Sequence, residues 1–196
     1  MRKIVCIVFL LPAILFGMAA CAASRETPDP VSGLDFTELV GLEFWFGSGV
    51  GAWSTVVEIF PDGTFTGYYH DSDAGDNGPD YPDGTMYECC FSGEFSAFKK
   101  VDEYTYSTRC VSLKTEGTAG EEKILDGIKV ITADPYGFDD ADEFMLYLPG
   151  KRASELPAGF LDWSHGSASS GALDCHGLYN VAGQQGFTSY RNSPLT

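Results

Sequence analysis

The chain has 196 residues, with 28 Asp or Glu against 12 Lys or Arg, so its formal net charge at pH 7 is −16. Nucleic acids and anionic lipid headgroups would be repelled by this charge, which argues against both as partners. The length and the 14% aromatic content are sufficient for one domain with its own hydrophobic core.

The first twenty residues have the pattern of an export signal. A basic pair at positions 2 and 3 precedes the apolar run 4–17 (IVCIVFLLPAILFG), and residues 18–21 (MAAC) form a cleavage-site pattern that ends in cysteine. An uncleaved anchor helix is the alternative. The apolar run is shorter than the roughly 20 residues that span a bilayer, and it contains Pro12.

The end of this segment resembles the lipobox of bacterial lipoproteins, with Ala19, Ala20 and Cys21 in the matching positions. The resemblance implies lipidation of Cys21, and acyl chains there would hold an extracytoplasmic protein at the cell membrane. The polar residues 22–32 contain two prolines and no periodicity, which is typical of a tether. We therefore expect three parts: a signal peptide at 1–20, the lipidated cysteine and tether at 21–33, and a single β-rich domain at 34–196.

Alternating apolar residues predict an antiparallel hairpin early in the domain. Residues 34–40 favour a short helix and 42–46 a strand, and residues 53–59 then alternate in the period-two pattern of a half-buried strand. Asp62-Gly63 is a strong hairpin signal before the next strand at 64–70. Further strands are expected at 85–98, 103–113, 124–131, 143–148, 177–181 and 187–190.

One late helix interrupts this β pattern. Ser154 is its expected cap, and Pro157 lies in its first turn, where no amide donor is needed. Eight or nine strands with short connections predict an all-β fold with one or two short helices. We expect a single antiparallel β-barrel, or else a β-sandwich.

The strings GAWSTVVEIFPDGTFTGYYHDSDAGD and DPYGFDDADEFMLYLPG resemble a domain of uncharacterised extracellular lipoproteins of Gram-positive gut bacteria, over most of residues 42–190. This resemblance implies a location and no particular activity. The strand order is more loosely similar to lipocalin-like barrels. Gly51-Ala52-Trp53 corresponds only in part to the Gly-x-Trp signature of that family.

Four cysteines fall within the predicted domain, at positions 89, 90, 110 and 175. An exported chain permits two disulfides among them, with three connectivities. If the turn between the flanking strands lies at residues 100–101, Cys90 or Cys89 falls nearly opposite Cys110. We expect a disulfide between Cys90 and Cys110, with buried free thiols as the alternative.

Closely spaced aspartates mark the turn at residues 71–84. Asp71, Asp73 and Asp76 are hard oxygen ligands in a glycine-containing loop, which makes Ca²⁺ the one candidate cofactor. The spacing does not match an EF-hand. A solvated acidic turn is the alternative interpretation.

No catalytic motif is present, since the chain lacks Gly-x-Ser-x-Gly, His-Glu-x-x-His, Cys-x-x-Cys and a Walker loop. We expect a non-enzymatic module that binds an apolar ligand, a glycan or a partner protein inside or at the rim of a barrel. The candidate binding residues are the aromatic residues Trp45, Trp53, Tyr69, Tyr87 and Phe91, which would otherwise be ordinary core. The alternative is a cell-surface hydrolase that uses paired carboxylates such as Asp71 and Asp73.

Overall fold

The computed structural model describes residues 33–49 and 51–191. The predicted signal peptide, Cys21 and the tether up to residue 32 lie outside the described residues. The regular secondary structure of the described part is almost all β-strand, with very little helix, which confirms the all-β prediction. Its strands are β1 (Leu42–Gly47), β2 (Trp53–Ile59), β3 (Thr64–Asp73), β4 (Thr85–Phe95), β5 (Lys99–Asp102), β6 (Thr105–Thr115), β7 (Glu122–Leu125), β8 (Ile128–Thr132), β9 (Glu143–Tyr147), β10 (Gly177–Asn180) and β11 (Gln185–Arg191).

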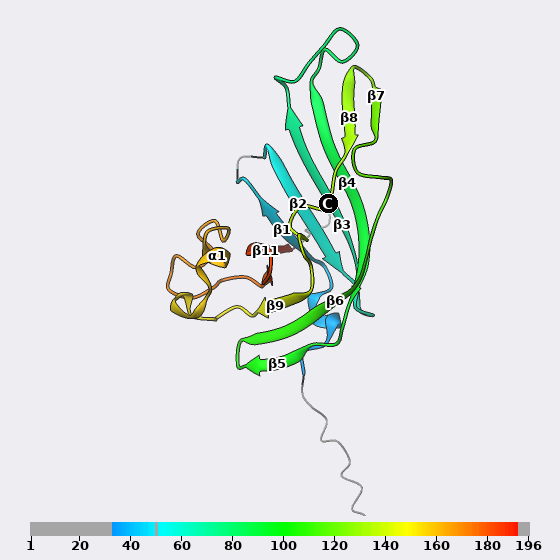
Figure 1. Ribbon diagram of the computed structural model, residues 1–196. Coiled ribbons are helices and arrows are strands. Elements are labelled where there is room, and N and C mark those ends of the chain that lie inside the picture. The colour runs from blue at the N-terminus through cyan, green and yellow to red at the C-terminus, as the bar shows by residue number, and fades with distance from the viewer. Residues whose placement is uncertain (1–32, 50, 192–196) are drawn as a thin grey trace, which may run out of the picture. The chain divides into compact units, whose positions relative to one another are not determined.

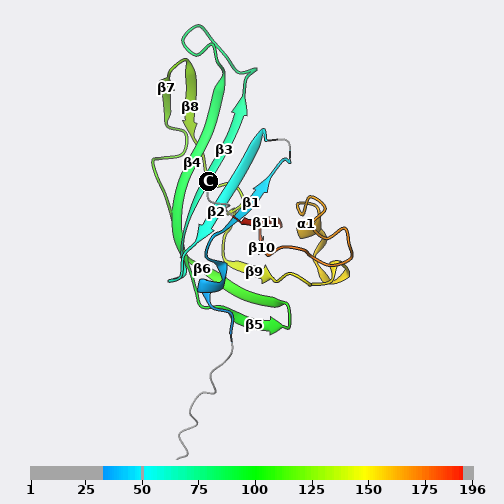
Figure 2. The same ribbon diagram turned by 180° about the vertical axis from the view of Figure 1, so that it is seen from behind.

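Eight of these strands close into an antiparallel barrel in the order β6-β9-β10-β11-β1-β2-β3-β4, with β4 pairing back onto β6. Because the sheet closes on itself, the fold is a β-barrel and not a β-sandwich. The outer halves of β3 and β4 continue past the barrel, and β8 pairs in parallel with β4 there, with β7 at the edge (Figure 1, Figure 2). We call this part the sheet extension (residues 70–73, 85–88 and 122–132).

Helical structure is short. The helix expected at 34–40 is a 3₁₀ turn, η1 (Phe36–Leu39), in which Asp35 accepts a hydrogen bond from the Thr37 amide at 2.8 Å. The late helix is limited to η2 (Ala153–Glu155) and the four-residue α1 (Ala158–Leu161). Figure 1 shows α1 and its connecting loops on the side of the barrel near β11.

Phenylalanine rings fill the barrel interior. Seven such side chains come from the strands and are at most 3% exposed: Phe44, Phe46, Phe65, Phe91, Phe95, Phe144 and Phe187. An eighth, Phe138, comes from the β8–β9 connection, and the three rings nearest to its own have centroids at 5.0 Å (Phe91), 5.1 Å (Phe144) and 5.3 Å (Phe65). Gly67 allows this packing, because a Cβ there would overlap the Phe91 ring.

A buried polar network holds the connection that carries Phe138. The Asn180 side-chain amide is fully buried and donates to the carbonyl oxygens of Asp139 at 2.8 Å and Gly137 at 3.2 Å. The Gln185 amide donates to the Asp139 carboxylate. Because burial without a partner costs each polar group free energy, these bonds favour this conformation of the connection.

The strand pairing between β4 and β6 differs from the expected one. Residues 99–102 form the separate strand β5, which pairs with the start of β6, so the turn is not at residues 100–101. A bulge between Glu94 and Phe95 shifts the register further and places Cys110 opposite Phe95. The strand expected at 124–131 is also two strands, because Asp126 and Gly127 adopt positive φ and turn the chain between β7 and β8.

Candidate functional site

The structure does not bring the five predicted binding aromatics together. Phe91 lies in the filled interior and Trp45 on the outer face of the barrel, while Tyr87 lies in the sheet extension. Only Trp53 and Tyr69 share a neighbour, the ring of Tyr136, at 5.1 and 5.8 Å. A ligand cavity enclosed by these five side chains is therefore not formed.

The cluster of Trp53 and Tyr69 closes one end of the filled interior. Trp53 also packs against Phe46 at 5.0 Å and against Trp163 at 5.6 Å. Burial raises the pKa of Tyr69 to about 12, and the negative charge of Asp71 adds to this effect. These rings extend the core rather than line an empty site.

Trp45 faces outward because β1 alternates. Phe44 and Phe46 are fully buried in the interior, so the intervening Trp45 projects from the opposite face of the strand. Its cross-strand partners are Val56 on β2 and Thr188 on β11. An indole on the outside of a barrel can contact a ligand without any change in the core.

Two further rings meet Trp45 from distant parts of the chain. Tyr190 on β11 is 52% exposed, and its ring lies edge-on to the indole at 6.5 Å. His165, in the loop after α1, lies at 5.1 Å. Its Nε2 is 3.0 Å from the carbonyl oxygen of Gly47, and since a carbonyl only accepts, Nε2 carries the hydrogen.

The backbone of His165 adopts φ +48°, the left-handed region that non-glycine residues seldom occupy. Such conformations cost of order 1–3 kcal/mol and cluster at binding sites. Here the conformation places the imidazole between Trp45 and Gly49. Trp45, Tyr190 and His165 border a hollow of about 370 Å³, which we call the outer aromatic groove (Glu43, Trp45, Gly49, Val56, His165 and Tyr190).

A second hollow of about 200 Å³ continues the groove across β2 and β3. It shares Glu43 and Val56 with the first and adds Glu58, Thr66 and Tyr68 among its lining residues. Glu43 and Glu58 are directly opposite each other in the β1–β2 pairing. The outer face thus presents aromatic rings beside two carboxylates.

A larger hollow, of about 460 Å³, lies beside β4 and β7, and half of its lining residues are glutamates. Lys123 forms an ion pair with Glu88 there at 3.2 Å. Within residues 33–49 and 51–191, no three His, Cys, Asp or Glu side chains are placed to hold a metal ion. This hollow has no aromatic ring in its lining, so we favour the outer aromatic groove.

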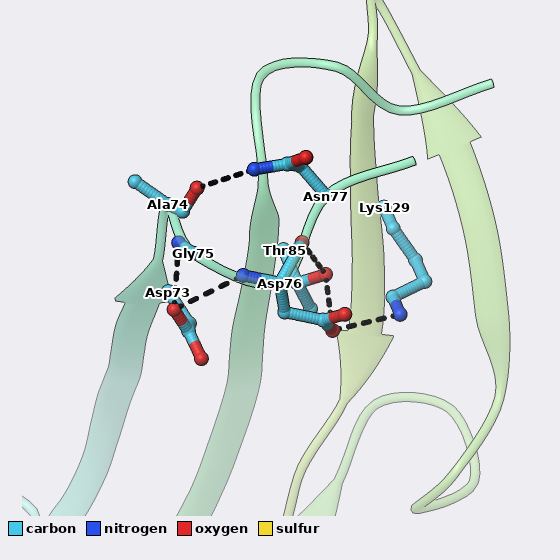
Figure 3. Close-up of polar contacts among 7 residues, drawn as sticks. All are labelled: Asp73, Ala74, Gly75, Asp76, Asn77, Thr85 and Lys129. Atoms are coloured by element: carbon cyan, nitrogen blue, oxygen red, sulfur yellow. Dashed lines mark hydrogen bonds and ion pairs between the residues drawn. The ribbon is translucent and has the colours of Figure 1, made fainter. Parts of the chain in front are cut away.

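The acidic turn is held by its own hydrogen bonds and an ion pair, as Figure 3 shows. Asp73 Oδ1 accepts from the amides of Gly75 at 2.8 Å and Asp76 at 3.2 Å. Asp76 Oδ2 accepts from Thr85 Oγ1 and pairs with Lys129 Nζ, each at 2.8 Å. The hydrogen bond from Lys129, followed by that from Thr85, lowers the pKa of Asp76.

The structure therefore does not assemble the predicted Ca²⁺ site from Asp71, Asp73 and Asp76. Asp71 lies on β3 opposite Tyr87, and Asp73 is two residues further along the same strand. An extended strand separates such positions by about 6–7 Å, and Asp76 turns away toward β8. The same geometry does not place Asp71 and Asp73 across a cleft, as the hydrolase alternative requires.

The expected disulfide between Cys90 and Cys110 is also not formed. All four cysteines in the described residues are free, and the register places Cys110 five positions along β4 from Cys90. The physical reason is the separate strand β5, which moves the turn and so the pairing. Burial raises the pKa of the Cys89 thiol to about 11.

Sequence alternation alone would have placed Trp45 on the outside, opposite in parity to Phe44 and Phe46. Glu43 shares this outward face of β1, whereas Tyr190 follows only once the β1–β11 pairing is known. Nothing in the sequence indicates that His165 returns to β1.

None of the helices in the part of the chain that the structure describes is long and apolar enough to cross a membrane. Searches of protein-family models, curated proteins and solved structures give no match to this chain.

Proposed function

We propose that the chain is a lipid-anchored extracytoplasmic binding protein that holds a small organic ligand in its outer aromatic groove. The observation that carries this proposal is the meeting of Trp45, Tyr190 and His165 around a hollow of about 370 Å³ on the outer face. Ligand sites in proteins commonly have volumes of about 300–1,000 Å³ and combine apolar walls with a few polar groups. The groove has both.

The barrel interior is the less suitable place for a ligand. Its largest side chains are fully buried phenylalanines, and Phe138 packs among them from the β8–β9 connection. The lipocalin-like comparison would imply an internal ligand, which the filled interior does not favour. The lipid anchor at Cys21 rests on the lipobox resemblance and would present the groove at the cell surface.

The three tryptophans give a direct test, because Trp45 lies in the groove whereas Trp53 and Trp163 pack together at the end of the interior. We would label the full-length protein in detergent with 5-fluorotryptophan and add small sugars, phenyl compounds and amines while recording ¹⁹F spectra. At least one compound should shift the Trp45 signal alone, and Trp45→Phe identifies that signal. Shifts confined to Trp53 and Trp163 would place the ligand at the barrel end and refute the proposal.

A further inference from the structure

The charge of the groove points to the chemistry of its ligand. Glu43 and Glu58 lie directly opposite each other in the β1–β2 pair, so the two joined hollows carry two carboxylates. No Lys or Arg lies among the described residues that line the two joined hollows. The whole chain is also strongly acidic, at −16. A positively charged ligand complements this surface, and an anion would be repelled.

The aromatic side chains of the groove also favour a positively charged ligand. The face of an indole or phenol ring carries partial negative charge, so it attracts a cation that lies within about 6 Å of the ring centre. Trp45 and Tyr190 are arranged edge to face at 6.5 Å, so their faces point in different directions around the hollow. Tyr68, 39% exposed, adds a third ring at the second hollow.

We infer that the outer aromatic groove binds a small organic ammonium ion, in which alkyl groups surround the charged nitrogen. The alkyl groups would contact Trp45, Tyr190 and Val56, while the charge would lie near Glu43 and Glu58. A hollow of about 370 Å³ accommodates a trimethylammonium group with a short chain. This inference rests on the proposed function, because it names the ligand class for the same groove.

Choline and its neutral carbon isostere, 3,3-dimethylbutan-1-ol, separate charge from shape. We would titrate each into the fluorotryptophan-labelled full-length protein at constant ionic strength, with sodium chloride as the salt control. Choline should shift the Trp45 signal and bind about 3- to 30-fold more tightly than the isostere, as expected for a cation–π contact and nearby carboxylates. Sodium chloride should not shift this signal.

Matched substitutions test each contribution. Glu58→Gln should weaken choline binding about 2- to 5-fold and leave binding of the neutral isostere unchanged, whereas Glu122→Gln on the exposed strand β7 should change neither. Tyr190→Leu should weaken choline about 3- to 10-fold, with Tyr104→Leu as its control. Tyr190 is half exposed, so its loss should not prevent folding.

The outcomes distinguish this inference from the proposed function. Equal affinity for choline and its isostere would overturn the ammonium inference and leave the groove as the binding site. If neither compound shifts the Trp45 signal but a neutral compound does, the inference is likewise overturned and the proposed function stands. If no compound shifts that signal, both are refuted.

Discussion

The ring of Phe138 lies 5.0 Å from the ring of Phe91, in the middle of the barrel interior. One ring comes from the β8–β9 connection and the other from β4. Their contact shows that a connecting segment, rather than a ligand, completes the core. It also explains why the candidate site lies on the outer face.

Phe138→Ala should therefore destabilise the domain strongly. The side chain is 3% exposed, and removing it would leave a cavity among five neighbouring rings. We expect a loss of about 3–5 kcal/mol in the free energy of unfolding, measured by urea denaturation. Tyr190→Ala, at an exposed position, is the control and should cost under about 0.5 kcal/mol. A Phe138→Ala protein as stable as the wild type would mean that the connection does not complete the core.

The buried polar network that holds the β8–β9 connection can be tested separately. Asn180→Ala removes the donor to the carbonyl oxygens of Gly137 and Asp139 and leaves them buried without that partner. The expected loss is about 1–3 kcal/mol, by the same denaturation experiment. Hydrogen exchange should also speed up at residues 135–141. Unchanged exchange there would show that other contacts hold the connection.

The sequence predicts the parts of this fold that depend on local pattern, and fails where pairing is decided at a distance. The alternation in 53–59 and the Asp62-Gly63 turn predict β2, β3 and their hairpin correctly, and so the β character of the domain. The bulge between Glu94 and Phe95 and the separate β5 leave no comparable local signal. The cysteine pairing, which depends on them, was therefore predicted wrongly.

The candidate site also combines a feature set by local sequence pattern with features set by long-range contacts. The outward direction of Trp45 is implicit in the alternation of β1, but β1 acquires Tyr190 as a neighbour only through its pairing with the last strand. His165 reaches Trp45 through a loop with no regular structure and a positive φ. Local sequence pattern carries no information about such a contact.

Thiol labelling of the native protein tests the corrected cysteine arrangement. Cys90 is exposed and should react with a maleimide first, without prior reduction, whereas Cys89 is 1% exposed and has its pKa raised to about 11 by burial. Because the thiolate is the reactive form, Cys89 should label last. Mass spectrometry of peptides after timed labelling gives the order. If Cys90 and Cys110 react only after a reductant is added, the two cysteines form the disulfide that the sequence predicted, and the corrected arrangement is wrong.

The lipid anchor is tested by Cys21→Ser. This change removes the only thiol that the lipobox resemblance assigns to acylation, so the protein should appear in the culture medium or accumulate as an uncleaved precursor. Both outcomes can be measured by growing the cells with labelled palmitate and then separating the membrane fraction from the culture medium. Wild-type protein that carries no label and fractionates like the variant would refute the anchor.

The ion pair between Asp76 and Lys129 should make the stability of the acidic turn depend on pH. The Lys129 and Thr85 hydrogen bonds lower the Asp76 pKa in the folded protein below its ordinary value of 3.8. The folded state therefore holds the carboxylate form more firmly than the unfolded state, and this contribution is fully present above pH 3.8 and lost as the pH falls through the lower folded pKa.

Asp76→Asn should thus destabilise the domain by the same amount at pH 5 and pH 7, and the difference from the wild type should shrink below about pH 4. Urea denaturation followed by tryptophan fluorescence at pH 7, 5 and 3 measures it, with Asp80→Asn in the same turn as control. The Lys129 pKa is raised, chiefly by its hydrogen bond to Asp76, so the contribution should also decline above about pH 10.5. An Asp76→Asn effect of equal size at pH 3 and pH 7 would show that the carboxylate charge does not stabilise the turn.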